Sequence, residues 1–493
     1  MKTDSLRSMK VLFLTLGNGI NIIVNFLTLP YLVRSLSYEE YGSYGQVLIL
    51  VSLLQGIFTF NLNQVANLAF SKHPSDPGLV FSSLMRTSFL MGLLSVLFLL
   101  LISPVVGISF DNPMLPRFLA LSTLSLAAQV PVPVLLSVLI FHDRVKESTL
   151  ILVVTNLVKV AAMFVSIHFL NSVEWLFVGI GFSSLIQLIL LYFSVPKSIR
   201  TLSSFDKSMA SGLLAMASPL VLSAVIERGV IYLDGVMVST MLSTMDFAIY
   251  RAGAIEVPFI SAIYGSVAAI VMPEIARMFS DGDLQRIVQL KRRAVNATAF
   301  LVYPVLIYLL IFSAPLITYY LSDRYSGSAI IFAIFSLALF VRVNDYQDVI
   351  IVSGNSRFIF MVIVIMLIFC LLLNVVFISQ WGVIGAAWAY IVFLFTYAGI
   401  LLSKTASILE CRISDIFDFP TIMKVLLISL ACVAPLWLIY EHSFRQLWII
   451  VIGTPVYLFA VYGLSWRFGL IEKEMVNRLV ARLPMVSKFK LLL

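Results

Sequence analysis

Long apolar segments recur along the whole chain and constrain its fold more than any other feature. Each has about 18 to 28 residues, enough for a helix to cross a hydrocarbon core about 30 Å thick. Apolar residues make up 60% of the chain and charged residues only 12%, roughly half the charged share of a typical soluble domain. The sequence therefore predicts an all-α integral membrane protein with no sizeable soluble domain.

Fourteen membrane spans are predicted from these segments. They lie at residues 10–33, 44–70, 79–103, 117–141, 147–170, 173–195, 209–242, 247–272, 294–318, 326–352, 357–378, 383–403, 420–440 and 446–466. The first is too long for a signal peptide and lacks a small-x-small cleavage site, so we expect a retained helix. The longest loops, at 273–293 and 404–419, are expected on the cytoplasmic side.

Lysine and arginine are distributed unevenly between the two sets of loops. One set, which includes both termini, carries 24 of the 33 basic residues, and the opposite set carries four. Basic residues accumulate on the cytoplasmic side of membrane proteins. The asymmetry predicts a multi-pass protein of the bacterial inner membrane with both termini in the cytoplasm. The net charge of +8 then reflects topology and contact with anionic lipids, and no nucleic-acid partner is expected.

Two pairs of segments repeat at an offset of 206 residues. LSYEEYGSY at 36–44 matches LSTMDFAIY at 242–250, and Trp175-x3-Gly179 matches Trp381-x3-Gly385. An offset of six spans preserves orientation, so the repeats would be related by a pseudo-two-fold axis along the membrane normal. We therefore predict two six-helix lobes, at residues 1–200 and 201–405, followed by spans 13 and 14 and a basic tail at 406–493.

Five basic residues lie inside predicted spans, where a charge costs at least about 3 kcal/mol unless it faces a cavity, a partner or a polar ligand. They are Arg86, Lys159, Arg228, Arg251 and Arg342. They predict a cationic lumen, with Arg228 the strongest candidate for a phosphate contact. Snorkelling is the alternative for Arg86 and Arg251, and a hydrogen-bonded packing role is the alternative for Lys159. Arg342 could instead be neutralised by Asp345 at i+3.

Five acidic residues in the predicted second lobe form the complementary set. They are Glu227, Asp234, Glu256, Asp345 and Asp348. Helical spacing places Glu227 and Asp234 on one face of span 7 and predicts the same for Asp345 and Asp348 on span 10. They could bind H⁺ or Na⁺ as coupling ions, or they could balance the arginines. The sequence has no phosphate-binding loop that would support ATP-driven transport.

Span 7 is about 34 residues long, and Ser218-Pro219 and Glu227-Arg228-Gly229 are expected to interrupt it. Broken helices commonly line transport sites. Pro131-Val132-Pro133 in span 4 is a second expected kink. The three cysteines and four histidines show no metal-ligand spacing, so no metal or cofactor is expected.

Several motifs together resemble one transporter family. They are LPYLVR at 29–34, YGSYG at 41–45, DFAIY at 246–250, MPE at 272–274 and GVIGAAWA at 382–389. This pattern resembles the polysaccharide-transport family of lipid-linked oligosaccharide flippases, the O-antigen flippases of the multidrug/oligosaccharidyl-lipid/polysaccharide exporter superfamily. The resemblance implies translocation of an undecaprenyl-diphosphate-linked sugar unit to the periplasmic leaflet by alternating access. A glycan polymerase or another assembly protein is an expected partner.

Two other functions fit parts of the pattern. A drug or solute exporter of the same superfamily would share the architecture, but its cavity would favour acids and aromatic residues. A membrane-embedded glycosyltransferase or O-antigen polymerase would need a large periplasmic loop. The outward loops here are too short, so a transporter is expected rather than an enzyme.

Overall fold

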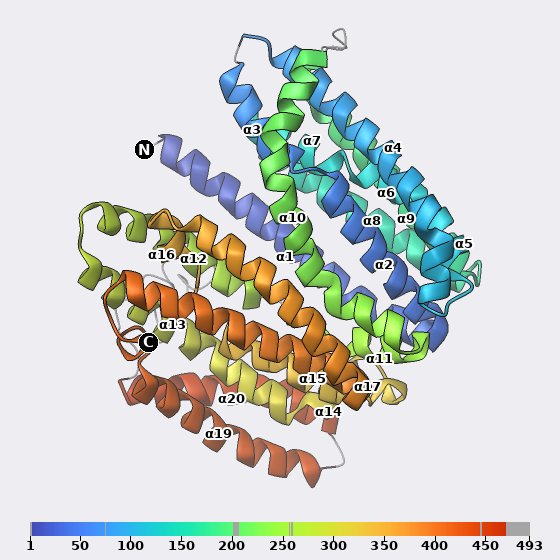
Figure 1. Cartoon of the computed structure of the whole chain (residues 1–493). Helices are drawn as coiled ribbons and strands as arrows, with labels where there is room; N and C mark the ends of the chain where they lie inside the picture. Colours follow the sequence, from blue (N-terminus) through green and yellow to red (C-terminus); the bar gives the residue numbers. More distant parts are fainter. Residues whose placement is uncertain are drawn as a thin grey trace. The chain divides into compact units, whose positions relative to one another are not determined.

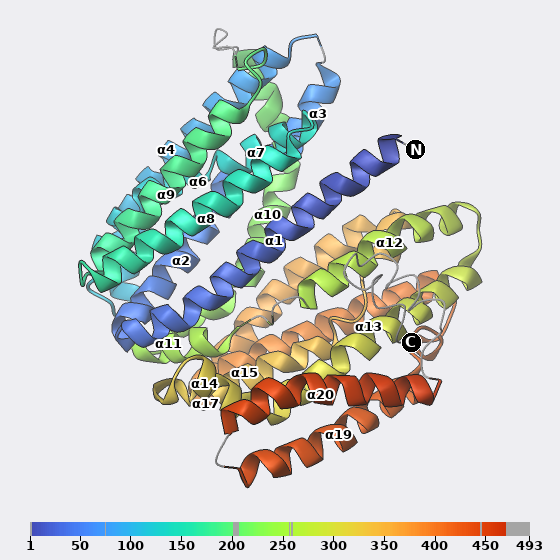
Figure 2. The same ribbon diagram turned by 180° about the vertical axis from the view of Figure 1, so that it is seen from behind.

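A computed structural model describes residues 2–73, 75–200, 207–255, 257, 260–443 and 446–469 (Figures 1 and 2). The described residues are helical apart from turns and short connections, and they contain no strand. This confirms the predicted all-α class. The chain forms two compact units. Unit 1 contains residues 1–252 and 367–389, and unit 2 contains residues 253–366 and 390–493. These units do not coincide with the two repeat lobes, which stay a prediction.

Unit 1 is built from long helices and from helices divided into shorter pieces. Its elements are α1 (Lys2–Ser35), α2 (Tyr38–Phe58), α3 (Leu62–Lys72), α4 (Pro77–Ser109), α5 (Leu115–Leu121), α6 (Thr123–Gln129), α7 (Val132–Phe141), α8 (Val145–His168), α9 (Val173–Ser194), α10 (Lys207–Met241) and α11 (Thr244–Gly253). Helix α8 packs between α1 and α9, and α10 packs on α2. The pieces α3 and α7 pack together in a core that also includes parts of α4 and α9.

Unit 2 begins with the last residue of α11 and contains the following elements. They are α12 (Ile260–Ser280), α13 (Leu284–Ile311), α14 (Ser313–Tyr320), η1 (Asp323–Tyr325), α15 (Ser328–Ser336), η2 (Leu337–Phe340), α16 (Asp348–Val352), parts of α17 (Ser356–Ile408), α18 (Ile413–Ile416), α19 (Phe419–Glu441) and α20 (Gln446–Arg467). Helix α19 packs on α13 and α20. An aromatic core centred on Tyr308, Phe312 and Tyr457 joins these three helices.

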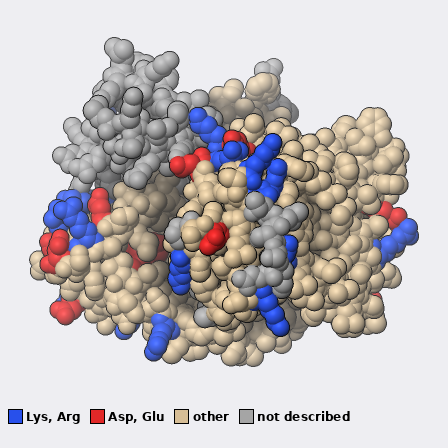
Figure 3. Space-filling model, turned by 90° about the horizontal axis from the view of Figure 1, so that it is seen from above, with Lys and Arg blue, Asp and Glu red and all other residues tan. Residues whose placement is uncertain are grey.

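Nine segments of the described chain are long and apolar enough to cross a membrane. One of them, α17, contains both predicted spans 11 and 12, and between these spans it has a kink at Gly382, with φ 57° and ψ −136°. Gly385 then comes so close to the Phe377 carbonyl that an added Cβ would lie 1.9 Å from its oxygen. The predicted spans outside the nine correspond to α1, to α10 and to two interrupted segments. The protein is a multi-pass membrane protein, and Figure 3 shows wide uncharged areas between separate groups of charged side chains on one face.

The two LSxx segments that match in the sequence have the same local structure. Ser37 and Glu40 form a capping box at the start of α2, in which each side chain accepts from the other residue's backbone N–H. Ser243 and Asp246 make the equivalent pair of bonds at the start of α11. The two helix starts also touch, because a Cβ on Gly42 would lie 2.4 Å from the Thr244 carbonyl oxygen. The same short polar signature therefore starts two packed helices, α2 and α11, in the same way.

The predicted interruption of span 7 is wrong, because the backbone of α10 is helical from Lys207 to Met241. A proline removes the hydrogen bond to the carbonyl four residues earlier, which for Pro219 belongs to Ala215. The Ser218 hydroxyl donates to that carbonyl at 3.1 Å and replaces the missing bond. Serine side chains are known to rescue proline in membrane helices in this way.

The breaks fall in spans 2, 4, 8 and 10 instead. Span 2 is divided at Phe60 and Asn61, whose φ angles are 54° and 51°. Span 4 is divided at Ser122 and again before Val132, which confirms the kink expected at Pro131-Val132-Pro133. Span 8 is divided between α11 and α12, where the sequence contains Pro258. A residue before proline disfavours the helical conformation.

Span 10 is non-helical at residues 341–347, between η2 and α16. The Asp345 side chain accepts from the Gln347 backbone N–H at 2.9 Å, a local bond that competes with helix formation. The helical turn on which the alternative pairing of Arg342 with Asp345 depends is therefore absent. The shared helical face predicted for Asp345 and Asp348 is wrong for the same reason.

The predicted long loop at 273–293 is also wrong. Helix α12 continues to Ser280 and α13 begins at Leu284, so a turn of three residues joins them. Gly282 makes that turn possible with φ 75°, a conformation that favours glycine. Lys291, counted from the sequence among the loop cations, lies instead in α13 with 1% of its side chain exposed.

Candidate functional site

A polar cavity of about 360 Å³ lies within unit 1 beside Arg228. Its walls come from the end of α2, the 59–61 break, the start of α3, α7 and the middle of α10. The lining residues are Ser52, Gln55, Gly56, Thr59, Asn61, Asn63, Gln64, Pro133, Arg228 and Tyr232. Arg228 is the charged residue of this set, and the other polar members are hydroxyl or amide side chains. The cavity can therefore offer an anion a guanidinium and offer hydroxyl groups several hydrogen-bonding partners.

Two backbone breaks create the polar wall of the cavity. The left-handed conformations of Phe60 and Asn61 end α2 and turn the start of α3, and the Thr59 hydroxyl caps the Gln55 carbonyl at 2.7 Å. On the other side, Pro133 cannot donate to the carbonyl of Gln129. The Gln55 side chain donates to that carbonyl at 3.2 Å instead. A polar side chain thus satisfies the backbone group that the proline leaves unpaired.

A chain of amide and hydroxyl contacts extends from this wall into unit 1. The Gln129 Nε2 donates to Ser184 Oγ at 3.1 Å and to Gln187 Oε1 at 2.8 Å. These bonds hold α6 on α9 beneath the cavity. Because Gln55 and Gln129 are both engaged in such bonds, the wall is held in place by contacts on its far side.

Arg228 projects into the cavity from α10, and its side chain is exposed there. Within the described part of the chain, it makes no hydrogen bond or ion pair. Gly56 faces it closely, since an added Cβ would lie 2.9 Å from both Arg228 Cδ and Nε. Glycine at position 56 therefore provides the space that the arginine side chain occupies.

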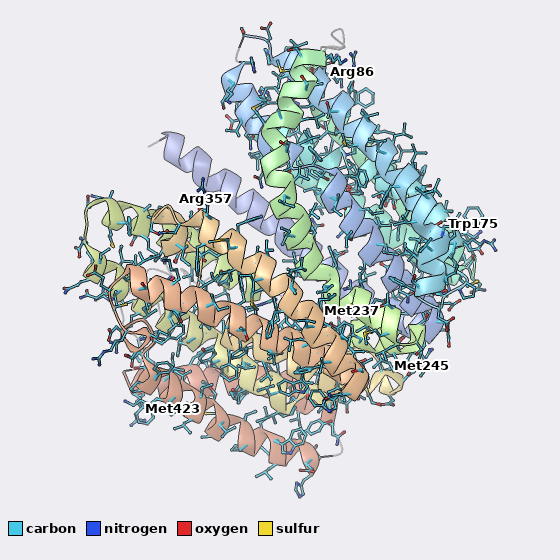
Figure 4. All side chains as sticks on the ribbon, in the orientation of Figure 1. Arg86, Trp175, Met237, Met245, Arg357 and Met423 are labelled. Atoms are coloured by element: carbon cyan, nitrogen blue, oxygen red, sulfur yellow. The ribbon has the colours of Figure 1, made fainter. Side chains whose placement is uncertain are left out.

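The other four predicted cations do not line this cavity. Lys159 is half-buried on α8 and makes no hydrogen bond or ion pair with a described residue, so the structure does not supply the hydrogen bonds of its packing alternative. Arg86 lies near one end of unit 1 and Trp175 near the other (Figure 4). Arg251 lies against α2, with its Cγ 3.5 Å from the position of an added Cβ on Gly45. A direct clamp by Arg228 and Lys159 together is thus not formed in this cavity.

Asp234 lies on α10 near the contact between α2 and α11. Its carboxylate accepts hydrogen bonds from the Tyr250 hydroxyl and, at 2.8 Å, from the Gly235 backbone N–H. Arg251 is close enough to act on it electrostatically. Of the other predicted acids in this part of the sequence, the Glu227 side chain and the whole of Glu256 lie outside the described residues.

A second polar cluster lies within unit 2, around the non-helical segment of span 10. Lys291 Nζ lies 2.7 Å from both carboxylate oxygens of Asp348 and 2.8 Å from the backbone carbonyl oxygen of Asp345. Lys291 and Asp348 are 1% and 2% exposed. Arg342 donates to the Tyr390 hydroxyl at 3.2 Å in the same unit. The structure therefore pairs Asp348 with a lysine, not with one of the predicted arginines.

Sequence reasoning missed Lys291 because it belongs to a basic run, Lys291-Arg292-Arg293, that resembles a cytoplasmic loop. The available signal was the acidic pair in span 10, which required a counter-charge from another segment. The neighbouring Arg292 pairs with Asp418 at 3.0 Å, so adjacent cations on α13 have different partners. No group of three potential metal ligands occurs among the residues described.

Helices broken around polar side chains are typical of the substrate sites of secondary transporters. The chain belongs to the polysaccharide biosynthesis protein family, whose model matches residues 31–330. A comparison with curated protein sequences found no match.

Solved structures with the same fold are transporters. The lipid II flippase MurJ, in an inward closed conformation, is 18% identical with a TM-score of 0.72, covering 93% of this chain and 99% of that one. An inward-facing multidrug resistance MATE family transporter of the MOP superfamily is 13% identical with a TM-score of 0.61. The match covers 79% of this chain and 96% of the transporter. A mutant of the Vibrio cholerae MATE transporter VcmN is 13% identical with a TM-score of 0.56. The match covers 83% of this chain and 98% of VcmN. These likenesses show that this chain has the fold of MOP-superfamily transporters.

Proposed function

We propose that this protein is a flippase for a lipid-linked oligosaccharide. Its substrate would be an undecaprenyl-diphosphate-linked O-antigen unit, carried from the cytoplasmic to the periplasmic leaflet by alternating access. The observation that carries the proposal is Arg228, exposed in a polar cavity within a unit built of membrane-spanning helices. Membership of the polysaccharide biosynthesis family supports the same class of substrate.

The chemistry of the cavity matches the parts of such a substrate. A guanidinium binds phosphate oxygens through two parallel charge-assisted hydrogen bonds. The side-chain amides of Gln55, Asn61, Asn63 and Gln64 are suited to sugar hydroxyls. The cavity volume of about 360 Å³ lies within the usual range for small-ligand sites, which is roughly 300 to 1,000 Å³. One phosphate and an adjoining sugar are the parts we assign to it.

The same lining distinguishes this proposal from drug export. Among the lining residues that the structure describes there is no carboxylate, and the charged one is Arg228. A cationic drug would be repelled by Arg228 and would find no counter-charge among these described residues. The cavity therefore favours an anionic substrate over the cationic substrates for which an acidic cavity would be expected.

An ion gradient is the proposed source of energy, with Asp234 the main candidate for coupling. Its half-buried position beside Tyr250 and Arg251 gives it partners that differ in charge, so ion binding there would alter local interactions. An ion can drive the conformational change only through different affinities for the two states. H⁺ and Na⁺ are the ions to compare.

The proposed location is the bacterial inner membrane, with both termini in the cytoplasm. Cysteines introduced at positions 75 and 285 should be shielded from an impermeant thiol reagent in intact cells. A cysteine at position 323, which is exposed, should react. Strong labelling at 75 and 285 alone would reverse the orientation and the proposed direction of transport.

The decisive experiment is reconstitution in proteoliposomes with a defined undecaprenyl-diphosphate glycan. Flipping would be followed with no gradient, with a Na⁺ gradient and with a H⁺ gradient. We expect glycan to reach the opposite leaflet and one of the gradients to increase the rate. If the folded protein moves no glycan under any of these conditions but transports a cationic drug, drug export would replace this proposal.

A further inference from the structure

Lys291 fills a position in unit 2 where oxygen atoms converge. Its Nζ contacts both carboxylate oxygens of Asp348 at 2.7 Å and the carbonyl oxygen of Asp345 at 2.8 Å. An ammonium group has three N–H donors, and three oxygens accept from it here. The side chain is 1% exposed, so protein atoms rather than solvent surround this charge.

The three oxygens are also ligands that hard metal cations prefer. Carboxylate and carbonyl oxygens suit hard cations, whereas sulfur and imidazole suit softer ions. The Asp345 carbonyl lies in the non-helical segment, where it is free of an intrahelical bond and can point at a cation, and Asp348 begins α16 directly after that segment. Without the lysine, this arrangement would leave a buried negative charge beside an uncommitted carbonyl oxygen.

A small cavity of about 20 Å³ adjoins the lysine. A site for one water needs at least roughly 10 to 15 Å³ by this measure. The cavity is lined by Tyr264, Thr298, Asn344, Asp345 and Asp348, among others. Asn344 is 6% exposed, and its Nδ2 has no hydrogen-bond acceptor among the described residues. A water here would accept from Asn344 and donate to a neighbouring carboxylate.

We propose that unit 2 contains a monovalent-cation site in which the Lys291 ammonium is the resident cation. Asp348 and the Asp345 carbonyl hold the ammonium, and one water in the adjoining cavity joins Asn344 to the acidic side chains. In the native protein this site is closed to Na⁺, because the tethered ammonium occupies the position and cannot leave. Lys291 thereby excludes the Asp348 carboxylate from coupling.

This inference refines the proposed function in one respect: it removes Asp348 from the candidates for ion coupling and leaves acids that Lys291 does not neutralise, such as Asp234. The occupancy of the site itself depends only on contacts within unit 2. Its test therefore needs no lipid-linked substrate. Absence of glycan flipping would not contradict the cation site. Absence of a Na⁺ effect on the Lys291 variant would not contradict the flippase proposal.

The test measures thermal unfolding of the purified full-length protein as NaCl replaces choline chloride at constant ionic strength. Lys291→Ala removes the ammonium and leaves the oxygens. We expect this variant to have a lower Tm than the wild type in choline and to regain part of it in Na⁺. A cation that binds only the folded state raises Tm in proportion to its occupancy. The regain should exceed any Na⁺ effect on the wild type.

Two variants separate this site from other effects of Na⁺. Arg292→Ala removes the adjacent cation of α13, which pairs with Asp418, and it should show no Na⁺ response beyond that of the wild type. Lys291→Ala combined with Asp348→Asn removes the main anionic ligand and should lose the regain. If Lys291→Ala does not fold, Lys291→Gln, which is also uncharged but longer, replaces it in the same comparison.

The proposal is overturned if folded Lys291→Ala or Lys291→Gln shows the same Na⁺ dependence as the wild type. It is also overturned if the regain persists after Asp348→Asn, because the cation would then bind elsewhere. Equal stabilisation by choline and Na⁺ would show that ionic strength alone acts on the variant, which also contradicts the proposal.

Discussion

Replacing Gly56 with alanine should move Arg228 without removing its charge. The added Cβ would lie 2.9 Å from Arg228 Cδ and Nε, whereas ordinary contacts begin at 3.4 Å. The arginine must therefore retreat by about 0.5 Å. That distance equals the whole usable range of an N–H···O hydrogen bond, about 2.7 to 3.2 Å. A bidentate contact with phosphate would lose at least one of its two bonds.

A hydrogen bond to a charged group contributes about 1.5 to 3 kcal/mol. Loss of one bond should weaken binding of the diphosphate-linked glycan by roughly 10- to 100-fold, at 1.4 kcal/mol for each factor of ten. Folding should be little affected, because the arginine side chain is flexible and alanine favours a helix over glycine by about 1 kcal/mol. Affinity is measured by titrating the purified protein with the lipid-linked glycan, and stability by thermal unfolding.

Gly212→Ala is the matched control, because an added Cβ there meets nothing within 4 Å and the residue lies on α10 with Arg228. It should retain native affinity. Arg228→Ala should lose at least as much affinity as Gly56→Ala, and Arg228→Lys should recover part of it. Native affinity in both Gly56→Ala and Arg228→Ala, with both proteins folded, would refute the assignment of Arg228 to the phosphate.

Three further predictions address the charged groups. Lys291→Met should lower the free energy of unfolding by about 3 to 5 kcal/mol in chemical unfolding, because it leaves Asp348 buried and unpaired. The double variant Lys291→Met, Asp348→Leu should recover most of that loss, and an equal loss in both variants would contradict the importance of the ion pair. Asp234→Asn should reduce the gradient dependence of flipping in proteoliposomes more than it reduces glycan binding, and an unchanged gradient response would remove Asp234 from coupling. Burial tends to raise the pKa of Asp418, but hydrogen bonds from Arg292 and Thr421 outweigh it and hold that pKa below its usual value. The ionised Asp418 carboxylate should therefore stabilise the fold at neutral pH, and this stabilisation should disappear as the pH falls through the lowered pKa. Unfolding of wild type and Asp418→Asn from neutral to acidic pH should therefore converge at low pH, and a constant difference would contradict the assignment.

One residue of the candidate site, Arg228, could be predicted from its type and its depth in the membrane span. Arg228 was identified because a charge in an apolar segment needs a polar environment, and the structure places it in a polar cavity. The kink at Pro131-Val132-Pro133 followed from proline chemistry and forms part of the same wall. The amide residues Gln55 and Asn61 were not identified, because their polarity is ordinary until the 59–61 break brings them to the cavity.

Local rules failed where a distant or neighbouring group changed the outcome. Pro219 did not break α10, since the Ser218 hydroxyl satisfies the carbonyl that the proline leaves unpaired. Span 10, which reads as one apolar helix, is opened by Asp345 turning onto its own backbone and by a lysine that binds the freed carbonyl. Hydropathy measures the average polarity of a segment, so it detects neither kind of hydrogen bond.

The sequence by itself determined that this protein is helical, crosses a membrane many times and starts two helices with the same capping signal. Those properties depend on segment length, composition and contacts over a few residues, and all of these can be read from the sequence. Only the tertiary structure decided which spans break and which charges meet. Lys291 and Asp348 are separated by 57 positions in the chain, and their pairing arises because folding brings α13 against the interrupted span. A buried charge requires a counter-charge, but the segment that supplies it is chosen by packing.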